Sequence, residues 1–293
     1  PTINSHDFNN YIVDKISKDK NFDLVTSSEV TEIFKDGNEI ILKSNECKYI
    51  CKHVFDSRPN IKKAYMWQQF FGAYIEAEDN IFDENSPVFM DFSDVKNKFH
   101  FMYILPFSKS SALVESTYFS SNKENKLLNE QFIKKYMFDN YRGSNFMIEK
   151  TEFGSIPMDI SINNLSENYI TRIGSYSGAT RASTGYAFMN IQKQSDFIAS
   201  LMPDILEKKH KIKKNFHSII LRKMDKVFLE IIENDPEYMK KALMDLFRTK
   251  SHDPQIKFIS DNPSIIDIIK VILYLPKIKF LKYTLGLNNK NDK

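Results

Sequence analysis

Four long strand-like segments between residues 66 and 119 constrain most strongly what this chain can fold into. They are MWQQFFGAYIEAE, SPVFMDFSD, KFHFMYILPFS and SALVESTYFS. Segments of this kind favour a largely antiparallel sheet, in which many inward-facing side chains are Phe, Tyr, Met and Leu. The chain has 293 residues, of which 42% are hydrophobic, so it is large enough to bury a core against that sheet.

A different pattern precedes this sheet. It predicts a helix over residues 5–18, a strand at 22–26, a hairpin over 30–44 and a strand over 48–58. This order resembles the end of the dinucleotide-binding domain in flavoprotein monooxygenases, whose last strand runs into a DARG-like turn near the flavin. Here that strand ends in Asp56 and Arg58. The GxGxxG turn that would hold the ADP part of the cofactor occurs nowhere in the sequence, so we expect an N-terminally truncated chain.

Three of the eight glycines lie within twelve residues, in the stretch GSYSGATRASTGYAF at 174–188. Glycine permits positive φ and lets another molecule approach the main chain closely. Strands are predicted at 147–158 and 168–174 before this loop, and a helix at 185–200 after it. Such a strand, turn and helix N-terminus can bind an anionic or electron-rich group, although glycine turns before helices are also common where nothing binds.

Seven segments resemble the beta-cyclase type of lycopene cyclase found in bacteria, a flavoprotein family. They are FDSRP at 55–59, QQFFG at 68–72, FMDFS at 89–93, FMYILPFS at 101–108, ALVESTYFS at 112–120, GSIPM at 154–158 and the glycine loop. The resemblance implies an α/β fold with a truncated FAD/NAD(P)-binding Rossmann-like domain, an antiparallel substrate domain and a helical C-terminus. The expected domains are residues 1–65 for the remaining FAD-binding part, 66–160 for the substrate sheet, 161–202 for the return to the FAD-binding part, and 203–293 for the helical region.

The resemblance also implies the chemistry: an acid protonates the end of lycopene or a related acyclic carotene, and a beta-ionone ring closes without net oxidation. Glu115 occupies the family's essential glutamate position, on a strand face shared with Leu113 and Phe119, and is the expected acid. Asp91 is expected to share that proton or to orient Glu115, with a purely structural aspartate as the alternative. Glu152 is a weaker third candidate, because a glutamate before a turn is usually only polar.

By the same resemblance, FAD is the cofactor, in its reduced form and in a non-redox role, with NADPH as the reductant. The residues expected to approach it are Gly174, Gly178, Thr184 and Gly185 of the loop, together with Asp56 and Arg58. Aromatic side chains are expected either to wall a polyene tunnel or to form ordinary core. They are Phe70, Phe71, Phe101, Tyr103, Phe107 and Tyr118.

The C-terminal part is basic, because residues 204–293 carry 19 Lys and Arg against 12 Asp and Glu. A phospholipid surface fits this charge as well as a nucleic acid does, and a solvated lysine-rich face is the plain alternative. Residues 264–285 alternate apolar runs with lysines, which suits either a membrane interface or packing against helices predicted at 216–233 and 236–249. Because the implied substrate dissolves in a bilayer, we expect a cytoplasmic protein bound peripherally to the inner face of the cytoplasmic membrane, without a nucleic-acid partner.

Two other functions stay open at this point: an FAD-dependent hydroxylase acting on an apolar substrate, and an inactive membrane-associated relative. Position 175 is Ser where related hydroxylases carry the Asp of a GDA motif, which favours the cyclase. The histidines have no metal-ligand spacing, so no metal is expected. Cys47 and Cys51 lie too far apart in a predicted strand to form a disulfide. The sequence leaves the oligomeric state open.

Overall fold

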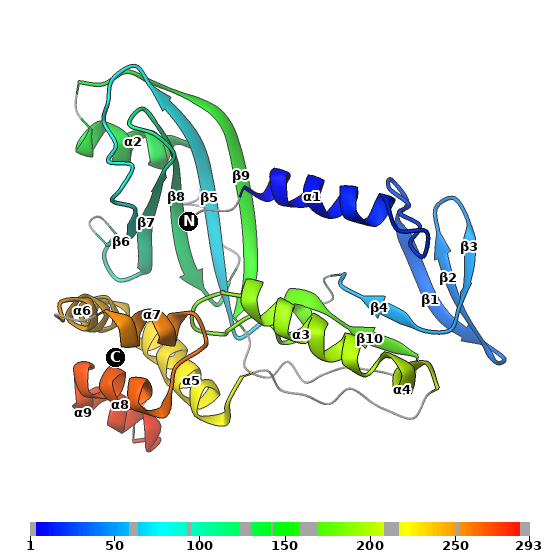
Figure 1. Ribbon diagram of the computed structural model, residues 1–293. Coiled ribbons are helices and arrows are strands. Elements are labelled where there is room, and N and C mark those ends of the chain that lie inside the picture. Colours follow the sequence, from blue (N-terminus) through cyan, green and yellow to red (C-terminus); the bar gives the residue numbers. More distant parts are fainter. Residues whose placement is uncertain are drawn as a thin grey trace.

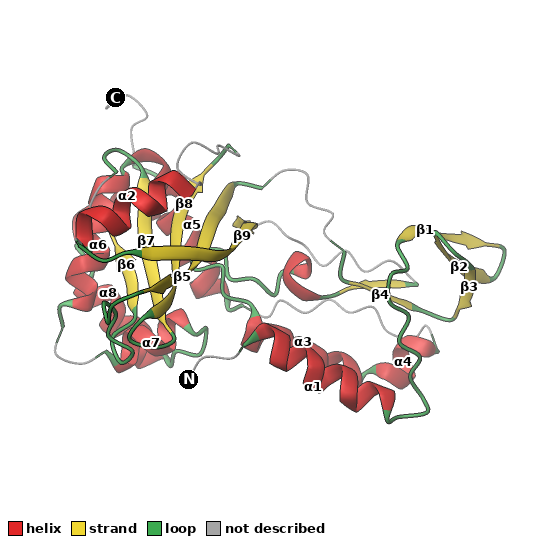
Figure 2. Cartoon of the chain, turned by 90° about the horizontal axis from the view of Figure 1, so that it is seen from above, coloured by secondary structure: helices red, strands yellow, loops and turns green. Residues whose placement is uncertain are grey.

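The computed structural model describes residues 4–58, 64–92, 95–122, 130–141, 143–158, 169–207, 217–249 and 252–287 (Figure 1). In this part of the chain, a five-stranded sheet with helices on both of its faces lies at one end. A second group of shorter strands and helices lies at the other end, and the view from above shows the same separation (Figure 2).

The five-stranded sheet is antiparallel throughout, with the order β6-β7-β8-β5-β9. Its strands are β5 (Met66–Ala77), β6 (Val88–Asp91), β7 (Phe99–Pro106), β8 (Ser111–Ser120) and β9 (Phe146–Met158). The antiparallel sheet predicted from the long strand segments is therefore confirmed. Strand β5 pairs with the central strand β8 on one side and with the edge strand β9 on the other.

The two faces of this sheet pack against different helices, because successive side chains of a strand point to opposite sides. On one face, Met102 and Val114 form a core with Met137 of helix α2 (Glu130–Asn140). On the other face, Phe99 packs in a core with Leu229 of the C-terminal helices. The sheet is thus covered on both sides, and the second interface holds the candidate site.

The second group of elements contains a three-stranded antiparallel sheet and a two-stranded parallel pair. Its elements are α1 (Ser5–Ser17), β1 (Val30–Asp36), β2 (Glu39–Ser44), β3 (Lys48–Cys51), β4 (Val54–Asp56), β10 (Ile170–Arg172), the 3-10 turn η1 (Gly174–Ser177), α3 (Phe188–Ser200) and α4 (Met202–Leu206). The parallel pair joins β4, which precedes the large sheet in sequence, to β10, which follows it. The mixed α/β class is confirmed.

The C-terminal region is helical, as expected. It consists of α5 (Ile219–Asn234), α6 (Pro236–Phe247), α7 (Asp253–Ile259), α8 (Ile265–Tyr274) and α9 (Lys277–Thr284). Ser264 and Asp267 form a capping box that starts α8, and Pro276 separates α8 from α9 because proline cannot continue a helix. None of the helices in the described ranges has the length and apolar character needed to cross a bilayer.

Two local predictions are wrong. Residues 22–26 form no strand, and Phe22, Leu24 and Val25 are exposed there. The predicted strand at 48–58 is divided between β3, which pairs with β2, and β4, which pairs with β10. In both cases the apolar pattern is local, whereas a strand forms only where another strand can pair with it.

Candidate active site

A cavity of about 1280 Å³ lies between the five-stranded sheet and the C-terminal helices. Phe101, Tyr103 and Phe119 line it from the sheet, and Met224 and Phe228 line it from α5. The lining is largely apolar with a few polar groups, which is the usual character of a site for an apolar small molecule.

Glu115 of β8 is directed into this cavity. It lies on the same face as Phe119, with Tyr103 opposite it on β7. Burial raises the pKa of Glu115 to about 7, and the charge of Glu152 contributes to this rise. The hydroxyl of Thr117 donates to Glu115 Oε1 at 2.5 Å and lowers the pKa of Glu115 in part. A carboxyl group with this pKa is protonated in a large fraction of molecules at neutral pH, so it can donate a proton into the cavity.

Asp91 lies on the opposite face of the sheet. It pairs with Met102, whose side chain packs under α2, and the hydroxyl of Tyr136 in α2 donates to Asp91 Oδ2 at 2.7 Å. The sheet therefore separates this carboxylate from that of Glu115. The expectation that Asp91 shares or orients the proton of Glu115 does not fit this geometry. The register of β6 shifts between Val88 and Asp91, and the sequence does not reveal such a shift.

Glu152 of β9 lies on the same face as Glu115. Gly72 of β5 pairs with Glu115 on one side and with Glu152 on the other, so these three residues form one row across the sheet. The hydroxyl of Tyr74, two residues further along β5, donates to Glu152 Oε2 at 3.2 Å. The sequence indicates Glu152 only weakly, because its position opposite Gly72 depends on how the strands pair, and a single strand's sequence does not reveal that pairing.

The aromatic residues expected to wall a tunnel divide into two groups. Phe101 and Tyr103 line the cavity. The other four are not among the residues that line the cavity. The ring of Phe70 covers Gly154, and Phe71 packs in the core beside α2. Phe107 stacks on Tyr74, and Tyr118 is buried with Lys98 over its ring. The rest of the aromatic lining of the cavity comes from residues outside that expected set, namely Phe89, Phe92, Phe99, Phe119, Phe228, Phe247, Phe258 and Phe280.

The glycine loop runs from β10 to the cavity. Gly174, Gly178 and Gly185 have φ values of 75°, 87° and 69°, which other residues adopt only at a cost. Gly185 also approaches β5 so closely that a Cβ atom there would lie 2.5 Å from Gln68 Oε1. Thr184 lines the cavity itself. The end of this loop thus lies next to the proposed acid's cavity.

The turn after β4 lies beside the start of the loop. The amide of Ile173 donates to the carbonyl of Asp56 at 3.0 Å, and a Cβ on Gly174 would lie 3.9 Å from Ser57 Cβ. Arg58 donates from Nε and Nη2 to the two carboxylate oxygens of Asp56 at 2.9 and 3.1 Å, and these bonds lower the pKa of Asp56. The structure therefore brings Asp56 and Arg58 together with the first part of the loop.

Buried polar atoms of two side chains near the loop have no hydrogen-bond partner within the described ranges. They are Gln68, through Oε1 beside Gly185, and Asn190 in the first turn of α3, through both amide atoms. Buried polar atoms nearly always have a partner. These atoms, and the open space around Gly174, fit a polar, planar cofactor such as a flavin at this loop.

A buried ion pair holds the middle of the loop against the C-terminal helices. Arg181 is fully buried, donates from Nε to Asp225 Oδ1 of α5 at 3.2 Å, and stacks on the ring of Phe258 at 4.2 Å. His217 Nε2 lies 3.0 Å from the carbonyl of Gly178 and donates to it. No local sequence pattern indicates this arrangement, because Asp225 and Phe258 lie 44 and 77 positions away from Arg181.

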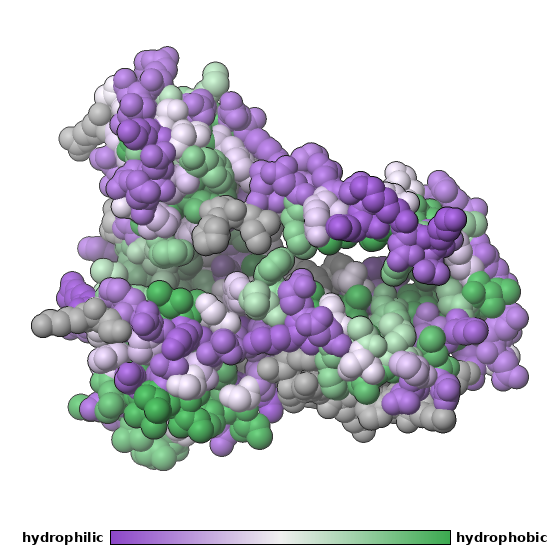
Figure 3. Space-filling model, in the orientation of Figure 1, coloured by the Kyte–Doolittle hydropathy of each residue, from purple (hydrophilic) through white to green (hydrophobic). Residues whose placement is uncertain are grey.

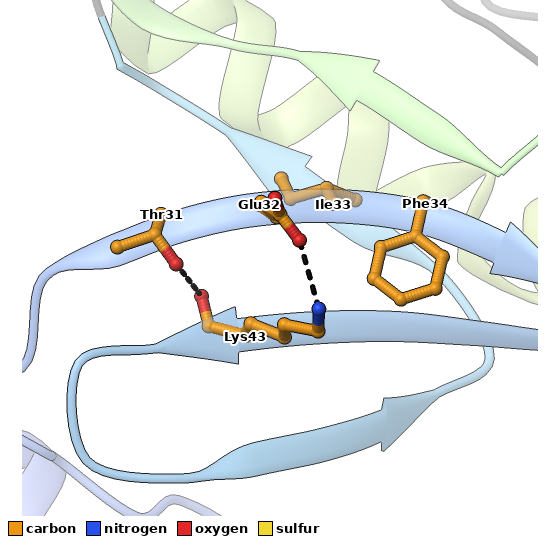
Figure 4. A pocket seen from close by; sticks show the side chains of 5 residues that line it. All are labelled: Thr31, Glu32, Ile33, Phe34 and Lys43. Carbon is orange, nitrogen blue, oxygen red and sulfur yellow. Dashed lines mark hydrogen bonds and ion pairs between the residues drawn. The ribbon is translucent and has the colours of Figure 1, made fainter.

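A hollow of about 570 Å³ on the β1–β2 hairpin is of a different kind (Figure 4). There Lys43 pairs with Glu32 at 3.0 Å and lies 5.0 Å from the ring centre of Phe34, while the hydroxyl of Thr31 donates to the Lys43 carbonyl. These contacts account for the lining groups, and the hollow lies apart from all candidate residues. In the described part of the chain, no three His, Cys, Asp or Glu side chains are grouped as metal ligands.

Solved structures share this fold. The flavoprotein/dehydrogenase from Cytophaga hutchinsonii is 10% identical, with a TM-score of 0.56 over 96% of this chain and 75% of that chain. The flavin-dependent brominase Bmp2 is 11% identical, with a TM-score of 0.54 over 92% and 73%. A geranylgeranyl bacteriochlorophyll reductase-like protein from Thermoplasma acidophilum is 13% identical, with a TM-score of 0.50 over 89% and 68%. These similarities concern the fold alone, and they confirm the predicted α/β fold class.

No curated protein matches the sequence. The family of lycopene cyclase proteins, in contrast, matches residues 1–285, which is nearly the whole chain. The chain therefore belongs to the lycopene cyclase family.

Proposed function

We propose that this protein is a lycopene beta-cyclase, a flavin-dependent isomerase that acts in carotenoid biosynthesis. It closes the acyclic ends of lycopene, or of a related carotene, into beta-ionone rings without net oxidation. The single observation that carries the proposal is the position of Glu115, whose carboxyl group faces an apolar cavity and has a pKa raised to about 7. Membership of the family supplies the class of substrate.

The reaction begins when Glu115 gives its proton to the terminal double bond of the polyene. The π electrons of that bond form the new C–H bond and leave a carbocation, which a second double bond attacks to form the C–C bond of the ring. A proton then leaves a ring carbon, its electrons restore a double bond, and the Glu115 carboxylate takes the proton up. One proton enters and one leaves, so neither an oxidant nor a reductant is consumed.

The cavity supports this chemistry through its apolar lining. Burying about 400 Å² of polyene contributes about 10 kcal/mol at ~25 cal/mol per Å², so binding requires few hydrogen bonds. The rings of Phe101, Tyr103 and Phe119 lie along the wall that carries Glu115. Aromatic faces stabilise a nearby cation by about 0.5 to 2 kcal/mol. The same wall can thus bind the hydrocarbon and stabilise the charge that forms on it.

The proposed cofactor is FAD, bound in reduced form with NADPH as the reductant. The residues proposed to hold it are Gly174, Gly178, Thr184, Gly185, Asp56 and Arg58. When bound, the reduced flavin supplies electron density that stabilises positive charge on the substrate. The chain contributes close backbone approach at the glycines and a hydrogen-bonding partner in Gln68, whose Oε1 is otherwise unpaired within the described ranges. The Arg181–Asp225 pair holds the loop in place.

Asp91 has a supporting role in this proposal. Its hydrogen bond to Tyr136 ties the short edge strand β6 to α2. Its neighbours Met90 and Phe92 line the cavity from the other side of that strand. Asp91 therefore acts by positioning the wall of the cavity.

The C-terminal helices are proposed to bind the inner face of the cytoplasmic membrane, as a peripheral contact. Apolar side chains gather on this end of the molecule (Figure 3), and α8 and α9 expose Ile265, Ile269 and Ile278, of which Ile278 is 78% exposed. Lys270 and Lys282 are exposed on the same helices, as suits an anionic lipid surface. Ile272 and Leu281 are exposed and also line the cavity, so the cavity borders this surface.

The test is conversion of lycopene in cells that accumulate it, expressing the protein from its own gene. We expect cyclised carotene from the wild type, none from Glu115→Gln, and wild-type conversion from Glu149→Gln, which changes an exposed carboxylate of β9. Unchanged lycopene in cells that contain folded, flavin-loaded wild-type protein would contradict the proposal. Oxygen consumption with NADPH and an apolar substrate would indicate a hydroxylase instead.

A further inference from the structure

The central glycine of β5 separates two carboxyl groups on the cavity face of the sheet. Gly72 pairs with Glu115 of β8 and with Glu152 of β9. Direct neighbours in adjacent strands lie about 5 Å apart, so residues two strands apart lie roughly 10 Å apart at their backbones. Glutamate side chains that lean over a glycine can approach more closely, because no side chain stands between them.

The space above Gly72 is occupied by the side chain of Glu152. A Cβ atom on Gly72 would lie 3.0 Å from Glu152 Cγ and 3.3 Å from Glu152 Oε1, and 3.0 Å from Leu113 Cδ1. The Glu152 side chain therefore bends over β5 toward β8. Glycine at position 72 is what permits this approach.

Tyr74 connects the two carboxyl groups further. Its hydroxyl donates to Glu152 Oε2 at 3.2 Å, and its ring stacks on Phe107 with a centroid separation of 6.0 Å. Burial raises the pKa of Tyr74, and so do the charges of both Glu152 and Glu115. The hydroxyl of Tyr74 is therefore a hydrogen-bond donor that holds the Glu152 carboxyl group in place.

Other charged and titratable groups lie on the strands beside this pair and on the helices across the cavity. Tyr103 lies opposite Glu115 on β7, and Lys150 of β9 lies 5.4 Å from the ring centre of Tyr74. Lys223 and Asp225 of α5 and Lys277 of α9 line the same cavity, and Asp225 is paired with Arg181. Glu152 is thus the carboxylate that lies nearest to Glu115 along the sheet, and Tyr74 lies against it.

We propose that Glu152 is a positioning residue for the catalytic proton: held by its hydrogen bond from Tyr74, it lies across Gly72 from Glu115 and keeps Glu115 in its acid form. Two carboxyl groups in this arrangement do not ionise together easily, so the pair carries one proton, on the member that faces the hydrocarbon. This inference rests on the proposed cyclase function. It adds to it the reason why Glu115 is ready to act as an acid at neutral pH.

The first test is the pH profile of cyclisation by Glu152→Gln. Activity requires protonated Glu115, so it falls as pH rises through the pKa of that group. Removing the neighbouring carboxylate should move this alkaline limb to lower pH by about 0.5 to 1 unit. Glu152→Asp keeps a carboxylate at this position, so its limb should lie close to that of the wild type. The control Glu149→Gln removes an exposed carboxylate of the same strand and should leave the limb in place. An unshifted limb in active Glu152→Gln would overturn the proposal.

The second test does not depend on activity. Infrared titration of the carboxyl C=O band that disappears in Glu115→Gln reports the protonation of Glu115 directly. We expect its midpoint near pH 7 in the wild type and at lower pH in Glu152→Gln. Equal midpoints would refute the pairing. A shifted midpoint in a protein that does not cyclise lycopene would instead uphold the pair and refute the proposed function.

Discussion

Replacing Glu115 by glutamine should stabilise the fold, and increasingly so as the pH rises. Burial holds the pKa of Glu115 near 7, whereas an unfolded glutamate titrates near 4.5. Because the folded-state pKa is raised, the folded protein binds this proton more tightly than the unfolded chain does. The stability from that proton is fully present below pH 4.5 and is lost as the pH rises to about 7. Glutamine cannot ionise and is free of this loss.

The magnitude follows from the size of the shift. At about 1.4 kcal/mol for each pH unit, the difference in unfolding free energy between Glu115→Gln and the wild type should grow by about 2 to 3 kcal/mol between pH 5 and pH 8. Other titrating groups, such as buried His100, are common to both proteins and cancel in the difference.

Urea denaturation at several pH values measures this difference. Trp67 is the single tryptophan and is buried on β5, so its fluorescence reports unfolding of the large sheet. A difference that stays constant from pH 5 to pH 8 would refute the reasoning, because it would mean that Glu115 titrates alike in the folded and unfolded states.

Three further outcomes are expected from the same structure. Gly185→Ala combines a positive φ with a Cβ atom 2.5 Å from Gln68 Oε1 and should lose bound flavin, measured by absorbance, whereas Gly37→Ala, also at positive φ but in open space, should retain it. Arg181→Leu leaves a buried carboxylate unpaired and should lower the unfolding free energy by about 3 to 5 kcal/mol in urea titrations, and a loss below 1 kcal/mol would contradict this. Ile278→Glu should weaken sedimentation with phosphatidylglycerol vesicles several-fold. Ile50 is also an exposed isoleucine, but it lies on β3, so Ile50→Glu should leave this sedimentation unchanged.

Patterns that repeat along one strand were predicted well from the sequence. Alternation in ALVESTYFS predicts that Glu115 shares a face with Phe119, and the structure has that face toward an apolar cavity. The hairpin predicted over residues 30–44 is also confirmed, since β1 and β2 pair across a turn in which Gly37 has a φ of 57°. Both features depend on short-range chemistry, namely the period of a strand and the freedom of glycine.

Features that depend on register were not predictable. Asp91 and Glu152 are both acidic residues of predicted strands, yet pairing places Asp91 under α2 and Glu152 across Gly72 from Glu115. The Arg181–Asp225 pair joins residues separated by 44 positions, so no local pattern indicates it. Residues 22–26 have a strand-like composition but form no strand, because local propensity does not supply a partner strand.

Cyclisation in D₂O tests the central claim most directly, which is that a carboxylic acid gives a solvent-exchangeable proton to the hydrocarbon. Mass spectrometry of the carotene formed by the wild-type protein should show one deuterium incorporated for each ring closed, and Glu115→Gln should form no ring. Rings that contain no deuterium, or rings formed at wild-type rate by Glu115→Gln, would contradict the account.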